Sequence, residues 1–448
     1  MRRALVALAL TSCGPATSPA TRWVRTVNAV ESPHTLRITT CFDGPAPARV
    51  RLRDDTAAIV DVTRGARLPS ADGLVTLAPA TRCVRQEFAA SGDAREAGGF
   101  VLSHRAWLWG PEPMTAGLRQ EARYELPPGW SVSTPWDGPA AIDPTAMQWG
   151  GYTVVGPFAR ETFTLGGIVL DVARLGGTSR PELPVRAWLG RAVEAIRTLD
   201  PALPIPRVQV ILTPSPGNPE GVSFGLVSRG GGRSVLLLVD PMAAPEAFRD
   251  DWQATHEFTH LLQPVLVDDD AWLSEGMATY YQEVLRARVG AITRETCWAH
   301  LANSMRAGHA MGGDRTLAEA SASMRRTHRY ARVYWWGAAF ALTLDVALRR
   351  AGSSLDAAAR GLHAAAARDP GRAWRATEAL AAMDASLGTT ACSELGRAAL
   401  AARAYPDVEA ALRELGVRVE ADGAVRFDDA APLAAVREAI TRGGLTGG

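Results

Sequence analysis

The sequence predicts an α+β multidomain protein with an N-terminal antiparallel β domain, a central α/β domain and a C-terminal α-helical domain. Its 448 residues correspond to two or three domains of about 150 residues each. Hydrophobic residues make up 47% of the chain and charged residues 21%, which indicates folded domains rather than a disordered chain. Along the chain, the spacing of apolar residues changes from the alternation of strands to the helical period of about 3.6 residues.

The charge balance excludes one class of function. Lys and Arg total 48 and Asp and Glu total 47, so the net charge is +1 at pH 7. Such a chain has no diffuse positive potential for holding nucleic acid or an anionic membrane surface. We therefore expect no nucleic-acid partner.

Residues 1–22 have the composition of a bacterial export segment. Two arginines follow Met1, an apolar run occupies residues 4–10, and Cys13 ends a Leu-Thr-Ser-Cys tetrad that resembles the lipobox of bacterial lipoproteins. The apolar run is too short to span a bilayer. We expect a lipoprotein of the bacterial cell envelope, on its periplasmic or extracellular face, that contacts the membrane only through a lipid on Cys13. Cleavage near Ala20, giving a secreted protein, is the alternative.

The other cysteines agree with export. Cys41, Cys83, Cys297 and Cys392 form an even set, as is typical of an oxidising compartment. Pairing within each predicted domain would join Cys41 to Cys83 and Cys297 to Cys392. The alternative is that one or more are buried thiols. Their spacing does not match that of a zinc knuckle.

Residues 23–165 form the predicted β-rich N-terminal domain. Short runs of alternating apolar and polar residues, such as 49–52, 73–77 and 100–102, are separated by Gly, Pro and Asp. This pattern is typical of an antiparallel sheet.

Residues 166–300 form the predicted α/β domain. Strands are expected at 167–175, 207–212 and 234–239, and a helix at 184–199. Another strand is expected to follow Gly221.

Residues 301–448 have the helical period almost throughout. A small hairpin is expected at 417–419 and 424–427. The most apolar segment, residues 335–348, contains Asp345 and is too short to span a membrane.

The sharpest chemical feature is a His-Glu-x-x-His motif formed by His256, Glu257 and His260. Apolar residues at helical spacing, starting at Phe248, and Pro264 at the end place it on a helix. Two histidines four residues apart on a helix lie on one face, so both imidazoles can bind one ion. Glu257 is then placed to act on a water at that ion. Two purely structural histidines are the alternative.

A catalytic zinc needs a third protein ligand and an open fourth position. Glu275 fits, because Asp268–Asp270 can cap a second helix that places Glu275 in its first turn. The small residues Gly276 and Ala278 would let this helix approach the first one closely. Glu275 as a mere first-turn acid is the alternative. Asp268–Asp270 are weaker ligand candidates, expected to be solvated caps. One Zn²⁺ is predicted.

Together, the two helices resemble those of the gluzincin metallopeptidases, most closely the glycyl aminopeptidase group. That resemblance implies a thermolysin-like α/β catalytic domain between a β-rich N-terminal domain and a helical C-terminal domain, here without a PDZ module. Residues 125–130 are similar to the end of that group's β domain. The Tyr-x-x-Gly helix at residues 334–337 is also similar, and it implies that Tyr334 stabilises the oxyanion. Tyr334 as a packing aromatic is the alternative, with Tyr330 as the second candidate.

Two positions depart from the family pattern. Gln263 stands where the glycyl group has Asn. The family's Gly-x-x-Glu motif, whose glutamate holds the substrate amine, is replaced by Gly221, Val222, Ser223, Phe224 and Gly225, and Glu220 lies just before them. Residues 221–228 can still pair with an extended substrate as an edge strand.

These features predict an exported zinc metallopeptidase that acts on peptides or proteins, with Glu257 as general base and Tyr334 facing the oxyanion. A true aminopeptidase is one alternative, and it needs an acidic amine anchor. A non-catalytic envelope lipoprotein that keeps the fold as a binding module is the other. The presence of all three ligands and of the base favours the enzyme.

Overall fold

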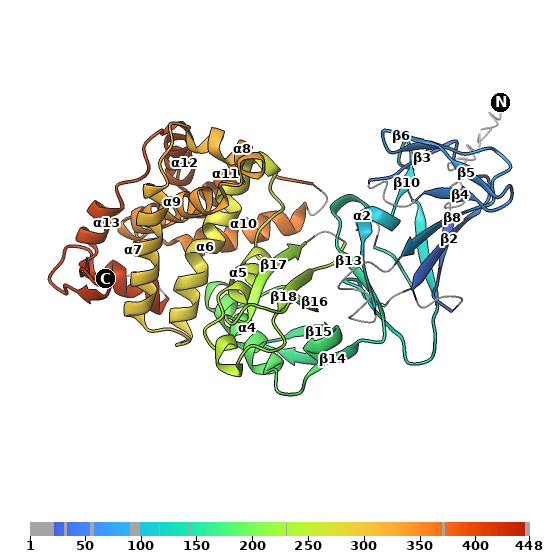
Figure 1. Ribbon diagram of the computed structural model, residues 1–448. Coiled ribbons are helices and arrows are strands. Elements are labelled where there is room, and N and C mark those ends of the chain that lie inside the picture. Colours follow the sequence, from blue (N-terminus) through green and yellow to red (C-terminus); the bar gives the residue numbers. More distant parts are fainter. Residues whose placement is uncertain are drawn as a thin grey trace, which may run out of the picture.

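The computed structural model describes residues 22–30, 34–53, 58–89, 99–115, 117–138, 140–143, 146–229, 231–369 and 372–443. Figure 1 shows β-sheets in the N-terminal part, a mixed α/β layer in the middle and helices in the C-terminal part. This arrangement confirms the predicted fold class. Cys13 and Ala20, on which the export prediction depends, lie outside the described residues.

A six-stranded sheet forms one layer of the N-terminal part. Its longer strands alternate between buried and partly exposed residues, because successive side chains point to opposite faces. In order across the sheet, the strands are β11 (Arg119–Glu125), β1 (Arg22–Asn28), β2 (Thr35–Asp43), β8 (Cys83–Ala89), β4 (Ile59–Asp61) and β5 (Ala66–Leu68). The prediction of antiparallel pairing is wrong at one place, since β1 and β11 are parallel. A parallel pair needs a long crossover, and the strands between them in the chain provide it.

Two smaller sheets and two short helices complete this part. One sheet contains β10 (Gly110–Pro111), β3 (Arg49–Arg51), β7 (Leu74–Thr76) and β6 (Ser70–Ala71). The other contains β12 (Ser131–Ser133), β13 (Tyr152–Gly156) and β9 (Phe100–Ser103). The helices are α2 (His104–Trp107) and α3 (Ala146–Trp149).

The central part is built on a five-stranded sheet. Its strands, in spatial order, are β14 (Ala159–Leu165), β15 (Ile168–Arg174), β16 (Arg207–Pro214), β18 (Ser234–Val239) and β17 (Val222–Ser228). The three inner strands are parallel, and both edge strands are antiparallel to their neighbours. The amphipathic helix α4 (Val185–Leu199) packs its apolar side into the same core. β14 belongs to this sheet although the predicted boundary at 165 places it in the preceding domain. Gly166 and Gly167, both at positive φ, turn the chain so that β14 pairs with β15.

Helix α5 (Gln253–His260) follows the sheet and is shorter than predicted. Phe248 lies in a separate 3₁₀ turn, η2 (Pro245–Phe248), where it is buried in the same core. Between them, the Asp251 carboxylate accepts a hydrogen bond from the Ala254 amide at 2.9 Å and caps α5. The apolar spacing therefore continued through two elements rather than one.

Helix α6 (Ala271–Arg288) is preceded by the 3₁₀ turn η3 (Asp268–Asp270). Asp270 occupies the N-cap position of α6, as predicted, but its side chain makes no capping hydrogen bond to this helix. Asp270 instead accepts a hydrogen bond from the Ala376 amide, at the start of another helix. The exposed Asp268 pairs with Arg325.

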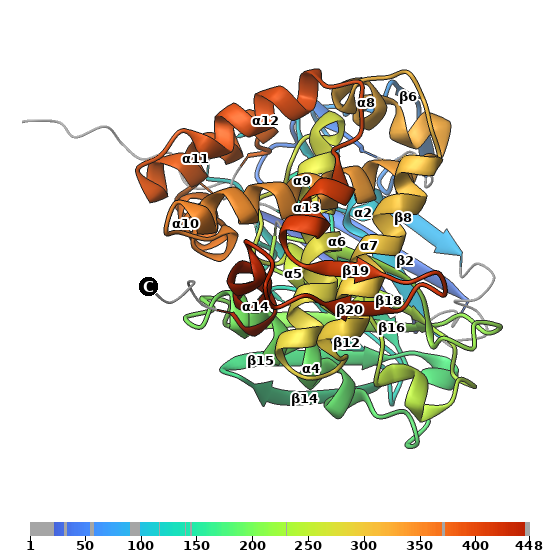
Figure 2. The same ribbon diagram turned by 90° about the vertical axis from the view of Figure 1, so that its left-hand side faces the viewer.

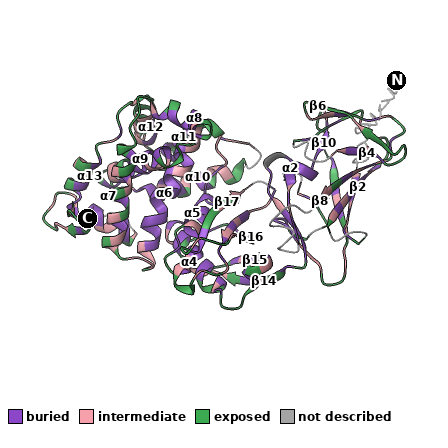
Figure 3. Ribbon diagram, in the orientation of Figure 1, coloured by how far each residue is buried: buried purple, intermediate pink, exposed green. Residues whose placement is uncertain are grey.

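The C-terminal part is helical, and α6 is buried along most of its length within it (Figure 3). The other helices are α7 (Arg294–Ala310), α8 (Leu317–Thr327), α9 (Tyr330–Arg350), α10 (Leu355–Arg368), α11 (Ala376–Leu387), α12 (Ala391–Ala401), α13 (Val408–Glu414) and α14 (Ala434–Arg442). The predicted hairpin is formed by β19 (Val417–Val419) and β20 (Val425–Phe427), which lie across α7 in Figure 2. It is the one sheet among the described residues after 300. Within the described residues, no helix is both long and apolar enough to cross a membrane.

One of the two predicted disulfides is present. Cys41 and Cys83 lie opposite each other on β2 and β8 and form a disulfide. The predicted bond between Cys297 and Cys392 is wrong, because both are buried free thiols. They lie on α7 and α12, which pack separately against α9, so nearness along the chain does not bring their sulfur atoms together.

Candidate metal centre and active site

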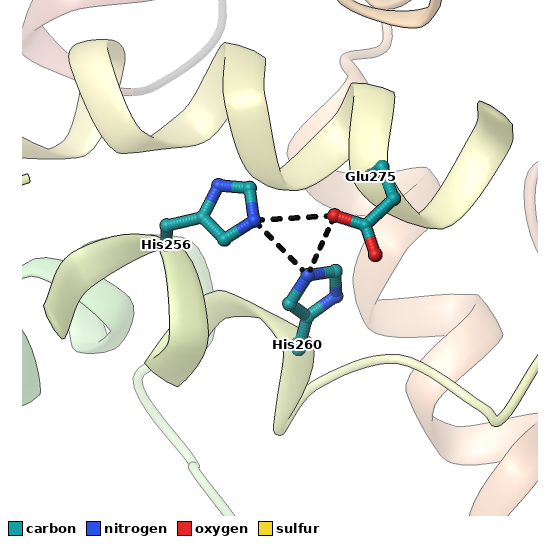
Figure 4. A group of neighbouring side chains, drawn as sticks. All are labelled: His256, His260 and Glu275. Carbon is teal, nitrogen blue, oxygen red and sulfur yellow. Dashed lines mark hydrogen bonds and ion pairs between the residues drawn. The ribbon is translucent and has the colours of Figure 1, made fainter. Parts of the chain in front are cut away.

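Helices α5 and α6 bring His256, His260 and Glu275 together at one point (Figure 4). The two histidine Nε2 atoms are 3.2 Å apart. Oε2 of Glu275 lies 3.3 Å from Nε2 of His256 and 3.4 Å from Nε2 of His260. Three candidate ligand atoms therefore form a nearly equilateral triangle.

This triangle fits a tetrahedral zinc ion. Zinc bonds of about 2.0–2.1 Å in tetrahedral geometry place neighbouring ligand atoms about 3.3 Å apart. Distances of 3.2 to 3.4 Å between the three atoms agree with this value. Two imidazoles and one carboxylate are also a donor set that suits zinc and leaves a fourth position open.

Each histidine is held by a hydrogen bond on its other nitrogen. Nδ1 of His256 is 2.9 Å from Oε1 of Gln282 and donates to it. Nδ1 of His260 lies 3.1 Å from Oγ of Ser274 and 3.3 Å from Oε1 of Gln263. Because an amide oxygen can only accept, these contacts put the proton on Nδ1 of His256 and leave its Nε2 free to bind metal. The same tautomer for His260 directs both Nε2 atoms to the centre.

Gln282 and Ser274 were not predicted from the sequence. Gln282 lies seven residues after Glu275, which places both on the same face of α6. Beyond it, the Gln282 amide donates to Glu283, whose carboxylate also accepts from Arg286 and His300. This chain of hydrogen bonds fixes the orientation of the His256 ring.

Glu275 lies beside the two histidines, but its position on α6 differs from the predicted one. It is in the second turn of α6 rather than the first. Gly276 does not face α5. A Cβ atom on Gly276 would lie 2.4 Å from Cα of Gly337, so the glycine allows close contact with α9. His260 and His256 outweigh the effect of burial and hold the pKa of Glu275 well below its usual range.

Glu257 is buried on α5 and its side chain lies against Gly225 of β17. Burial raises the pKa of Glu257, and the two histidines only partly oppose this effect. A carboxylate with a raised pKa is suited to taking and returning a proton near neutral pH.

Tyr334, in the second turn of α9, faces the centre. Its ring is nearly parallel to that of His256 at a centroid distance of 6.3 Å, and it lines the same cavity as Glu275. Burial and the Glu275 carboxylate raise the pKa of Tyr334, so the hydroxyl stays protonated and can donate. Tyr330 is more exposed and makes an edge contact with the Tyr334 ring.

These groups line a cavity of about 1390 Å³ bordered by β17, α5, α6 and the start of α9. Of the five predicted substrate-binding residues, Ser223, Phe224 and Gly225 line it, whereas Gly221 and Val222 do not. Val222 is fully buried, and its carbonyl accepts from Asn218 and Gln253. The part of β17 that can contact a substrate therefore begins at Ser223 rather than at Gly221.

Comparison with known proteins agrees with this geometry. Residues 258–338 match the family model of the M61 glycyl aminopeptidases, and this segment contains His260, Glu275 and Tyr334. Comparison with curated proteins gave no match.

Solved structures show a similar fold. An aminopeptidase N family protein from Idiomarina loihiensis matches with a TM-score of 0.67 and 15% identity, over 89% of this chain and 79% of that one. A two-domain M1 zinc metallopeptidase bound to L-arginine matches with a TM-score of 0.51 and 20% identity, over 86% and 94% of the two chains. An M1 zinc metallopeptidase from Deinococcus radiodurans matches with a TM-score of 0.50 and 19% identity, again over 86% and 94%.

The chain therefore resembles the gluzincin zinc metallopeptidases. The structure also explains one of its departures from the glycyl aminopeptidase pattern. Gln263 accepts from Oγ of Ser274 at 2.6 Å and also contacts Nδ1 of His260. It thus supports a candidate metal ligand of this gluzincin-like site.

Proposed function

We propose that this chain is an exported zinc metallopeptidase that hydrolyses peptide bonds at a single Zn²⁺ site. The proposal rests on one arrangement. Three ligand atoms, 3.2 to 3.4 Å apart, lie in a large cavity, and the buried Glu257 lies on the same helix as two of them.

His256, His260 and Glu275 would hold the ion. When bound, zinc would lower the pKa of a water and polarise the substrate carbonyl. Glu257 takes a proton from the water while the water oxygen attacks the carbonyl carbon of the substrate. Glu257 then returns the proton to the leaving amine. The Tyr334 hydroxyl donates a hydrogen bond to the carbonyl oxygen as negative charge develops on it.

Strand β17 would hold the substrate backbone. Among the described residues it pairs only with β18, so its other edge is open. Ser223, Phe224 and Gly225 line the cavity along this strand. An extended peptide can add to such an edge through main-chain hydrogen bonds, which bind the backbone without requiring a particular side chain.

Cleavage of internal bonds is favoured over trimming from a free amino terminus. The family's amine-binding glutamate is absent from residues 221–225, and Phe224 and Gly225 occupy the strand beside Glu257. Glu220 lines the cavity but is exposed. The Cys41–Cys83 disulfide supports export, because disulfides persist in oxidising compartments.

Product analysis by mass spectrometry on a mixed peptide library tests the proposal. Zinc-loaded protein should cleave peptides, and Glu257→Gln at equal concentration and equal zinc content should not. The cleavage positions separate internal bonds from N-terminal trimming. If both folded, zinc-loaded proteins release the same products or none, the catalytic role of Glu257 is wrong and the binding-module alternative gains support.

A further inference from the structure

Arg229 directly follows β17 and reaches the candidate active site. Its guanidinium donates to the carbonyl of His260 at 3.1 Å. It also lies close enough to Glu275 and Glu257 to interact with both carboxylates electrostatically. The residue lines the cavity that contains the three candidate ligands.

Arg229 has more hydrogen-bond donors than its contacts with the described residues use. A guanidinium has five N–H donors. The His260 carbonyl takes one of them, and no ion pair joins Arg229 to an acid among the described residues. Glu275 has the larger electrostatic effect on Arg229 of the two nearby acids, but its carboxylate contacts His256 and His260 instead.

A second arginine borders the same cavity. Arg105 of α2 lines the same cavity and forms no ion pair with a described acid. Acids such as Glu257 and Glu275 also line the cavity, but within the described part of the chain none of them forms an ion pair with Arg229 or Arg105.

We infer that Arg229 binds a carboxylate group of the substrate beside the scissile bond. This inference rests on the proposed peptidase function and names its substrate class. The carboxylate is supplied either by an acidic side chain or by the C-terminus of a short peptide. A planar guanidinium can bind either one through two parallel hydrogen bonds.

Arg229 also bonds to the last turn of α5, so a purely structural role must be separated from substrate binding. A structural role would lower cleavage of every substrate by the same factor. Carboxylate binding lowers cleavage selectively, because only carboxylate-bearing substrates lose an interaction. Selectivity between matched peptides is therefore the decisive measurement.

The test uses the full chain loaded with zinc and four peptides that share one cleavable sequence. Each has Glu or Gln next to the scissile bond, and each ends in a free acid or an amide. We expect kcat/KM to be at least about tenfold higher for the peptides whose carboxylate reaches Arg229, a factor typical of charge-assisted hydrogen bonds. Arg229→Gln should remove this ratio, and the side-chain and terminal pairs identify the source of the carboxylate. Arg326→Gln, which removes an exposed arginine outside the cavity, should keep it.

Two outcomes overturn the inference: no preference in the wild-type protein, or an equal loss on all four peptides in Arg229→Gln. Fluorescence anisotropy with the same labelled peptides gives a second readout, on Glu257→Gln with and without the Arg229→Gln change. If no peptide is cleaved but the carboxylate peptides bind more tightly when Arg229 is present, the peptidase proposal fails. The inference that Arg229 binds a carboxylate then still stands. If cleavage occurs without any charge preference in binding or turnover, the peptidase proposal stands and the role of Arg229 is wrong.

Discussion

Gly225 on β17 and Glu257 on α5 occupy adjoining space. A Cβ atom on Gly225 would lie 2.5 Å from Cγ of Glu257 and 2.6 Å from its Oε1. These distances are shorter than van der Waals contact, so the absence of a side chain at position 225 lets the proposed base lie beside the open strand edge.

Gly225→Ala should therefore displace the Glu257 carboxylate. Gly225 has no positive φ, so alanine fits its backbone and the effect is steric. A misplacement of about 1 Å can cost about 100-fold in rate, and we expect a loss of this size in kcat. Steady-state peptide cleavage and the thermal midpoint measure activity and folding separately. Gly190→Ala on α4, whose Cβ would make an ordinary 3.5 Å contact with Leu165, is the control. Full activity of Gly225→Ala would show that Glu257 is not in its working position.

Tyr334→Phe should lower kcat and leave KM nearly unchanged. The lost hydroxyl donates only to charge that develops during the reaction, and removing one such donor costs about 10²–10³ in kcat. Tyr330→Phe removes the hydroxyl of the more exposed neighbour and should have little effect. The kcat and KM of both variants on one peptide decide between them. An equal loss in the two would contradict the assignment to Tyr334.

Metal removal should destabilise the protein through His256, His260 and Glu275. At a free zinc concentration of 100 times Kd, binding adds about 2.7 kcal/mol to the free energy of unfolding. Differential scanning fluorimetry with a chelator, and then with zinc restored, measures the shift. His260→Ala should abolish it, whereas Glu257→Gln should retain it, because Glu257 is outside the group of ligand atoms. A zinc-dependent shift that survives in His260→Ala would place the metal elsewhere.

The candidate centre was predictable because its determinants are local. His256 and His260 share a helix face by their spacing alone, and Glu275 follows one short connection later. The β17 edge was also predicted, but the burial of Val222 was not. Val222 is part of the apolar core beneath the sheet, and its carbonyl accepts from Asn218 and Gln253; sequence spacing reveals neither contact.

Contacts between elements that are far apart along the chain could not be predicted from the sequence. Gly276 was expected to face α5, but it meets Gly337 of α9, more than 60 residues later in the chain. The orientation of α6 depends on that helix crossing. Cys297 and Cys392 show the same limit, since their helices pack separately against α9.

One disulfide and two free cysteines predict how many thiols can be titrated. In a chain carrying Cys13→Ser, denaturation without reductant should expose two thiols, from Cys297 and Cys392, and reduction should raise the count to four. Breaking the Cys41–Cys83 bond, with a sequence separation of 42, should lower stability by about 4 kcal/mol in the chain-entropy model. Thiol titration and urea unfolding of Cys41→Ala/Cys83→Ala test the two statements. No free thiol before reduction would mean that Cys297 and Cys392 are paired after all.

The buried His104 should make the N-terminal part sensitive to acid. Nδ1 of His104 lies 3.3 Å from the Gly150 carbonyl and Nε2 lies 3.1 Å from the Thr153 hydroxyl, which satisfies the neutral ring. Burial lowers the pKa of His104 to about 3, so as pH falls the unfolded chain binds the proton first. The neutral His104 ring makes its full contribution to the free energy of unfolding above pH ~6.5, the pKa of histidine in the unfolded chain. Below that pH the contribution falls by about 1.4 kcal/mol per pH unit, until the pH reaches the pKa of His104 in the folded protein. Urea unfolding at pH 7.5 and pH 5.0 should show a loss smaller by about 2 kcal/mol in His104→Gln than in the wild type. The exposed His309→Gln is the control, and an unchanged loss in His104→Gln would mean that another group causes the acid sensitivity.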